Sequence, residues 1–91
     1  MTLDGTLPSG ITAQAELAWQ HILKTLEHAG MGLADIVKIT QYLVHAHDIP
    51  AYAKVRARVL GDARPASMLM IVAGLPRPEF LIEIEAYAAK A

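Results

Sequence analysis

The chain has 91 residues, of which 54% are hydrophobic, and its eight Lys and Arg against nine Asp and Glu give a formal net charge of −1. A chain this short buries only about 60–65% of its extended surface, so we expect association with other copies to cover the apolar excess. The balanced charge, without a basic run, argues against binding to nucleic acid or to an anionic membrane, and the absence of cysteine excludes disulfides and thiol chemistry.

No apolar run reaches the ~18–20 residues that a membrane-spanning helix needs, and no charged start leads into an apolar signal segment. Repeats, low-complexity tracts and long linkers are absent as well. We therefore predict a single soluble domain over residues 1–91, located in the cytoplasm.

The first third of the chain predicts a loop followed by a helix. Residues 1–10 are rich in Gly, Pro, Thr and Asp and have no hydrophobic period. From about residue 11 to residue 28, apolar side chains recur at helical spacing, and Gly30 is well placed as a left-handed stop. Trp19 is expected close to the border between the apolar and polar faces. The predicted apolar face consists of Ala15, Ala18, Ile22, Leu26 and Ala29.

The remainder predicts a strand, a helix and two further strands. Residues 36–44 are rich in β-branched and aromatic side chains, as a half-buried strand is. Asp48, as a capping carboxylate, and Pro50 predict the start of a second helix, which Gly61 ends. Strands over 66–72 and 80–88 complete an α+β order with both helices on one face of a mixed sheet. The apolar face of the second helix consists of Tyr52, Val55, Val59 and Leu60.

The two C-terminal strands and their loop carry the most specific pattern. Residues 63–76 read Ala-Arg-Pro-Ala-Ser-Met-Leu-Met-Ile-Val-Ala-Gly-Leu-Pro, and residues 81–86 read Leu-Ile-Glu-Ile-Glu-Ala. This block resembles the signature of the RidA family, also called YjgF or liver perchloric-acid-soluble protein (endoribonuclease L-PSP). The resemblance implies a chorismate-mutase-like fold, a homotrimer with ligand clefts between subunits, no cofactor, and hydrolysis of imines or enamines to carbonyl compounds and ammonia.

The resemblance extends over residues 5–89, including the tract 35–43 and the approach 61–65 to the signature. Family members usually begin with some 30–40 further residues that form a hairpin and one more strand. We therefore expect a domain that is N-terminally truncated relative to the family and lacks its first strands. Two explanations stay open: a start assigned at an internal methionine, or a chain that is short in nature. A short chain would leave a sheet edge uncovered, which favours pairing with another copy.

The resemblance also points to candidate site residues. Ser67 stands where deaminating relatives have the arginine that pairs with the substrate carboxylate, and a serine offers one neutral hydrogen bond in place of a two-pronged ionic one. Glu83 matches the glutamate that positions the hydrolytic water, a role that a carboxylate in a cleft can fill. We predict Glu83 as the catalytic residue and Ser67 with Leu69 as the substrate-binding residues. On alternation alone, Glu83 and Glu85 would simply face solvent.

Two arginines are candidates to replace the missing anion-binding arginine. Arg56 occupies the position of an asparagine in the family's second helix, and Val59 that of a tyrosine, so Arg56 could point towards the cleft. Arg64 lies beside Pro65 at the entrance of a strand. For both arginines a structural or interface role is the simpler interpretation.

The remaining candidates favour structural roles. His45 and His47 could turn both imidazoles one way, but a metal site needs a third ligand and a supporting shell, so we predict no metal. Met68 and Met70 share one face of their strand, opposite Ser67 and Leu69, which is typical of a core or a subunit interface.

Three functions therefore remain as hypotheses. The first is a hydrolase acting on an imine, an enamine or a related small nitrogen compound, with altered substrate preference. The second is a trimeric ligand-binding or structural protein without catalysis. The third is a ribonuclease, against which the net charge and the lack of a basic aromatic surface count.

Overall fold

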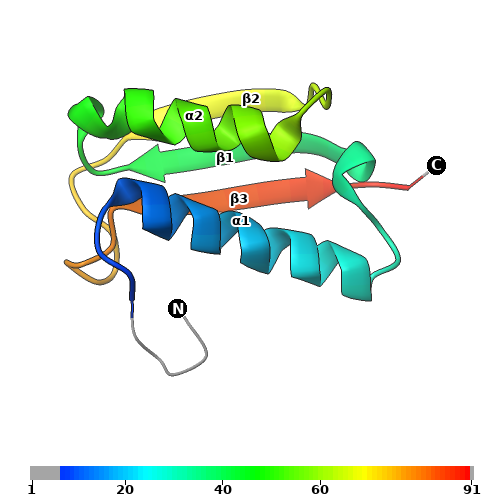
Figure 1. Ribbon diagram of the computed structural model, residues 1–91, viewed down its shortest axis with the longest axis horizontal. Helices are drawn as coiled ribbons and strands as arrows, with labels where there is room; N and C mark the ends of the chain where they lie inside the picture. The colour runs from blue at the N-terminus through cyan, green and yellow to red at the C-terminus, as the bar shows by residue number, and fades with distance from the viewer. Residues whose placement is uncertain (1–6, 91) are drawn as a thin grey trace.

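The computed structural model describes residues 7–90, in which two helices pack on one face of a three-stranded sheet (Figure 1). This arrangement confirms the predicted α+β class and element order. Leu7–Gly10 contains no helix or strand, as predicted, and the rest of the predicted loop, residues 1–6, lies outside the described residues. The elements are α1 (Ile11–His28), β1 (Ile36–Leu43), α2 (Ile49–Leu60), β2 (Ala66–Ile71) and β3 (Ile82–Ala88), with short 3-10 helices at Leu33–Asp35 and Ala46–Asp48.

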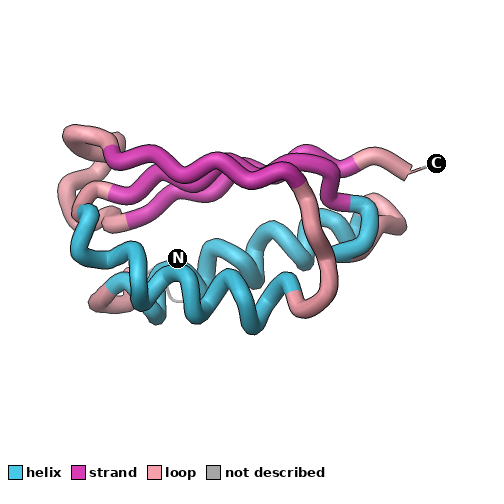
Figure 2. The backbone as a smooth tube through the Cα atoms, turned by 90° about the horizontal axis from the view of Figure 1, so that it is seen from above, coloured by secondary structure: helices cyan, strands magenta, loops and turns pink. Residues whose placement is uncertain are grey.

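The sheet has the order β2-β1-β3, with β2 parallel and β3 antiparallel to the central β1. Helix α2 supplies the long crossover that a parallel pair requires. Seen from the side, both helices lie in one layer and the strands in another (Figure 2). Within residues 7–90 the sheet therefore has a covered face, which packs on the helices, and an open face.

Register assigns the side chains to these two faces, because directly paired residues project to the same side. The covered face comprises Ile39, Gln41, Leu43, Ser67, Leu69, Ile71, Ile82, Ile84 and Ala86. The open face comprises Lys38, Thr40, Tyr42, Ala66, Met68, Met70, Glu83, Glu85 and Tyr87. The predicted separation of Met68 and Met70 from Ser67 and Leu69 is thus confirmed.

Helix α1 has the predicted bounds, and Gly30 follows it with a φ of 73°, a value that glycine adopts without a Cβ clash. The prediction for Trp19 is wrong, because the indole is 1% exposed and belongs to the core. Helix α2 packs beside α1 and encloses that flank, a tertiary contact that α1 alone does not reveal. The core consists of Ala15, Trp19, Ile36, Ile39, Leu43, Tyr52, Val55 and Ile82.

Helix α2 begins where predicted, but the capping role of Asp48 is wrong. Asp48 ends the preceding 3-10 helix and has helical dihedrals (φ −84°, ψ −8°), so its carboxylate makes no capping hydrogen bond. Its Oδ1 lies 3.6 Å from Nε2 of His47 instead. Gly61 ends the helix with a φ of 55°, as predicted.

The last strand starts later than predicted. Phe80 donates its N–H to the carbonyl of Arg77 (3.1 Å), which closes a turn, so β3 begins at Ile82. The buried amide of Gln14 ties this loop to α1: it donates to the carbonyls of Pro8 and Glu79 and accepts from the N–H of Leu81 at 2.8 Å. These bonds fix the loop between β2 and β3 against the start of α1.

Candidate functional site

The predicted catalytic and substrate-binding residues lie on opposite faces of the sheet. Ser67 pairs with Ile39 on the covered face, whereas Glu83 pairs with Tyr42 on the open face. The two residues also belong to the two outer strands, with β1 between them. One described chain therefore does not bring Ser67 and Glu83 into a common site.

Ser67 is part of a polar network between the sheet and α2. The side-chain amide of Gln41 donates to Oγ of Ser67 at 3.1 Å and to the carbonyl of Met68 at 2.7 Å. Its Oε1 accepts a hydrogen bond from the hydroxyl of Tyr52 at 2.7 Å and lies 3.4 Å from Nη1 of Arg56. Gln41 and Tyr52 are fully buried, so this network holds Ser67 in place.

Burial raises the pKa of Tyr52 to about 12, while the nearby indole of Trp19 and the charge of Arg56 act in the opposite direction. The phenol consequently stays protonated near neutral pH and serves as a hydrogen-bond donor to Gln41. Arg56 lies over the Tyr52 ring, with its guanidinium carbon 5.7 Å from the ring centroid. The ring thus helps to position the arginine.

A cavity of about 370 Å³ opens between the end of α2 and the start of β2. Arg56, Arg64 and Ser67 contribute its polar lining, and Pro65 and Leu60 contribute apolar lining. Arg64 also fills the structural role predicted for it, since its Nη1 donates to the carbonyls of Gly61 and Ala63 at 2.8 and 2.9 Å. Leu69 lies two residues further along the same face, half-buried against the core.

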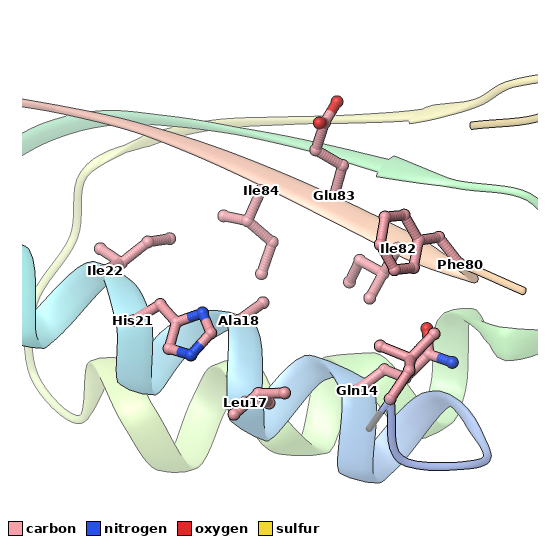
Figure 3. Close-up of a pocket in the computed structure, with 10 residues that line it drawn as sticks. Gln14, Leu17, Ala18, His21, Ile22, Phe80, Ile82, Glu83 and Ile84 are labelled. Carbon is pink, nitrogen blue, oxygen red and sulfur yellow. The ribbon is translucent and has the colours of Figure 1, made fainter. Parts of the chain in front are cut away.

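Glu83 borders a different cavity, of about 250 Å³, between α1 and β3. Figure 3 shows that its carboxylate points away from this cavity, whereas Ile84 and Ile82 point towards α1. His21 lies on the α1 side of the same cavity. Glu83 is thus an exposed side chain of the open face, and its predicted catalytic role needs a surface beyond the described chain.

Glu85, two residues further on, is exposed as predicted and accepts a 2.6 Å hydrogen bond from the hydroxyl of Tyr42. This hydrogen bond raises the pKa of Tyr42, because it stabilises the protonated phenol beside a negative charge. Glu85 is therefore already engaged with a neighbour on the open face. Among residues 7–90, neither Glu85 nor Glu83 forms an ion pair.

His45 and His47 lie side by side after β1. The rings of His45 and His47 stack at 4.9 Å between centroids, just after β1 has ended. No group of three or more His, Cys, Asp or Glu side chains within residues 7–90 could hold a metal ion. Nor does any helix in this part of the chain combine the length and apolarity needed to cross a membrane.

Comparison with known proteins identifies the family. The sequence profile of the Endoribonuclease L-PSP family matches residues 2–90. A RutC family protein of Pyrococcus horikoshii is 38% identical over 80 residues, which cover 88% of this chain and 63% of the relative. A second RutC family protein, from Pyrococcus abyssi, is 36% identical, with 88% and 62% covered. The chain belongs to the RidA/YjgF family.

Solved structures agree with this assignment to the RidA/YjgF family. A Thermotoga maritima protein superposes with a TM-score of 0.91 at 34% identity, over 98% of this chain and 70% of that chain. RidA of an Antarctic Psychrobacter gives 0.83 at 33% identity, with 89% and 65% covered. E. coli TdcF, solved with bound serine, gives 0.90 at 26% identity, with 96% and 70% covered. The chain spans a little under two thirds of the length of the two Pyrococcus RidA-family relatives.

Sequence reasoning missed two members of the polar network, Gln41 and Tyr52. The sequence places Gln41 in the family tract 35–43 and Tyr52 in the apolar face of the second helix. Neither assignment predicts a contact with Ser67. Alternation carried a signal, since Gln41 lies between Ile39 and Leu43 on the inward side of a strand. A polar residue at such a position needs buried partners.

Proposed function

We propose that this RidA-family chain hydrolyses an imine or enamine to a carbonyl compound and ammonia, with Glu83 activating the water. The observation that carries the proposal is the position of Glu83, whose exposed carboxylate lies on the open face and forms no ion pair within residues 7–90. The RidA resemblance, whose family profile matches residues 2–90, implies the same chemistry.

The reaction needs one group that first accepts and then returns a proton. The Glu83 carboxylate takes a proton from water as the water oxygen bonds to the carbon of the C=N group, and the carboxyl group then gives this proton to the nitrogen, which forms a carbinolamine. Glu83 next accepts the hydroxyl proton and gives it to the amine nitrogen as the C–N bond breaks. Ammonia leaves, the C–O bond becomes a carbonyl, and Glu83 ends as it began.

The proposed site lies between copies in a homotrimer. Ser67 and Glu83 lie on opposite faces of one chain, so a cleft that contains both draws them from different copies. The open face has apolar side chains that association would cover: Met68 is 52% exposed, Met70 37% and Tyr87 54%. Such a surface on a short chain favours a permanent assembly.

Substrate preference in this proposal follows from Ser67. A serine hydroxyl offers a single neutral hydrogen bond, whereas an arginine forms two parallel, charge-assisted bonds to a carboxylate. We therefore expect a 2-imino acid to lose the binding that an arginine at position 67 would supply. A substrate with an uncharged polar group at this point keeps its hydrogen bond to Ser67.

Ammonia release from enzymatically generated imines tests the proposal, using carboxylated and uncharged precursors. Glu83→Gln should reduce the rate at least about 100-fold, since the amide cannot take the proton. Glu85→Gln is the matched control, because it removes a carboxylate from the same strand and face, and it should retain most of the rate. Equal losses in the two variants would contradict the role of Glu83.

A non-catalytic, trimeric ligand-binding or structural protein is the second candidate. The observation that favours it is the engagement of Ser67 with the buried amide of Gln41, which gives Ser67 a structural task. In that case a folded trimer releases no ammonia above the uncatalysed rate, and Glu83→Gln leaves the background unchanged.

A further inference from the structure

The cavity between α2 and β2 has an unusual charge for a chain of net charge −1. Two guanidinium groups, Arg56 and Arg64, line it together with the hydroxyl of Ser67, and it contains no carboxylate among its lining residues. The ion pairs of residues 7–90 involve Arg58, Arg77 and His47, so neither lining arginine is neutralised by an acid.

We propose that this cavity binds a small oxyanion, a carboxylate or phosphate group of a metabolite, through the guanidinium of Arg56 with support from Arg64 and Ser67. The proposal shares Ser67 with the proposed hydrolytic site but is tested apart from hydrolysis, because binding here needs neither Glu83 nor turnover. It differs from the anion site of the deaminating relatives, in which the arginine belongs to the strand at the position of Ser67.

The contacts of Arg56 prepare it for this role. Its guanidinium carbon lies over the Tyr52 ring, 5.7 Å from the centroid, and Nη1 makes a long hydrogen bond of 3.4 Å to Oε1 of Gln41. A guanidinium has five N–H donors, so most of its hydrogen-bonding capacity remains for a ligand. Because the side chain is half-buried, solvent screens its charge less than that of a fully exposed arginine.

Arg64 removes an obstacle to anion binding at this place. The end of a helix presents carbonyl oxygens with partial negative charge, which repel an anion. Nη1 of Arg64 binds two carbonyls just beyond α2, those of Gly61 and Ala63, and so offsets part of this charge. Its other donors and its net charge remain. The nearest acid in sequence, Asp62, borders the adjoining hollow and forms no ion pair with Arg64.

Titration of the intact, 15N-labelled chain with inorganic phosphate and, separately, with acetate tests the site by NMR. We expect saturable shifts of the amides of residues 61–64, 66 and 67 with either probe, and the tighter probe indicates which oxyanion the cavity prefers. Arg56→Gln should weaken binding about tenfold, as the loss of a charge-assisted contact does. Arg58→Gln, two residues further along the same helix but paired with Glu16, is the matched control and should change binding less than about twofold.

Folding is monitored separately from binding. Arg56→Lys keeps the charge but lacks the planar fork, so it should bind at an intermediate level, and thermal unfolding without ligand should show each variant folded. Shifts that do not saturate, or that Arg56→Gln and Arg58→Gln weaken equally, would overturn the proposal and indicate general attraction to a basic helix. A chain that binds phosphate here but releases no ammonia would keep this proposal and remove the hydrolase.

Discussion

The two faces of the sheet differ in how completely the chain satisfies them. On the covered face, Ile39 and Leu43 are fully buried, and the polar side chain between them, Gln41, has partners for both its amide nitrogen and its oxygen. On the open face, Met68 and Tyr87 are more than half exposed. The covered face is therefore largely buried within a single chain, except along the outer strand β2, where Ile71 is 46% exposed. The open face presents side chains of the kind that subunit interfaces bury.

Stability and assembly are therefore associated with different faces of this small domain. The covered face supplies the stability and holds Ser67 and Arg56 in defined positions. The open face holds Glu83, and the substrate-binding residue Ser67 of the same chain lies on the other face, so Glu83 needs a second surface to complete the proposed site. We therefore expect substitutions on the covered face to change unfolding and those on the open face to change association.

The largest expected effect is on assembly. Met68→Asp puts a charge where we propose that copies meet, and an unpaired charge in an interface is costly, so the dissociation constant of the oligomer should rise on the order of a hundredfold. Sedimentation velocity over a concentration series measures this. Gln20→Asp adds the same charge on an exposed position of α1 and should leave the assembly intact. A Met68→Asp protein that stays fully assembled would show that the open face is not the interface.

The next effect is on stability. Leu43→Ala removes a fully buried side chain from the covered face and should lower the free energy of unfolding by about 3 kcal/mol. Urea denaturation at a fixed protein concentration measures the loss. Val37→Ala, which truncates a 54% exposed side chain outside the core, should cost less than about 0.5 kcal/mol while the chain is monomeric. Similar costs for the two would remove the distinction between buried and exposed positions of β1.

A smaller difference separates two neighbouring polar residues of β1. Gln41→Met leaves the hydroxyl of Tyr52 without its buried acceptor and the carbonyl of Met68 without its donor, at about 2 kcal/mol of unfolding free energy. Tyr42→Phe removes only the exposed bond to Glu85 and should cost about 0.5 kcal/mol or less. Should Tyr42→Phe prove the more damaging in urea denaturation, the buried network would not be what holds α2 to the sheet.

A further effect appears only at alkaline pH. The pKa of Tyr52 is about 12 in the folded chain against 10.0 for a free phenol. Between these values the unfolded chain loses a proton that the folded chain keeps, so stability is intact below pH 10 and falls as the pH rises towards 12. Tyr52→Phe should flatten this decline, measured as the change of unfolding midpoint with pH. An unchanged slope would show that a group other than Tyr52 causes the loss of stability at alkaline pH.

Most of the fold was predictable because its signals are local. The stops at Gly30 and Gly61 and the β-branched run of β1 depend on neighbouring residues, and the structure confirms them. The predicted apolar face of α1 is confirmed for Ala15, Ile22 and Leu26, whereas Ala29 lies beyond the helix and is exposed. The predicted capping role of Asp48 is wrong because a preceding 3-10 helix changes the dihedrals of the cap residue. The predicted border position of Trp19 is wrong because its burial depends on α2, thirty residues later in the chain.

The family and the α+β class follow from the sequence alone, since they depend on motifs and on periods of two and 3.6 residues. The same motifs single out Ser67, Glu83, Arg56 and Arg64. Which of these residues lie on the same side of the sheet follows from the tertiary structure. Strand pairing and the α2 crossover place Ser67 with Arg56 and Arg64 on one side of the sheet and Glu83 on the other. Register across strands and the packing of helices are long-range properties, and a linear pattern does not contain them.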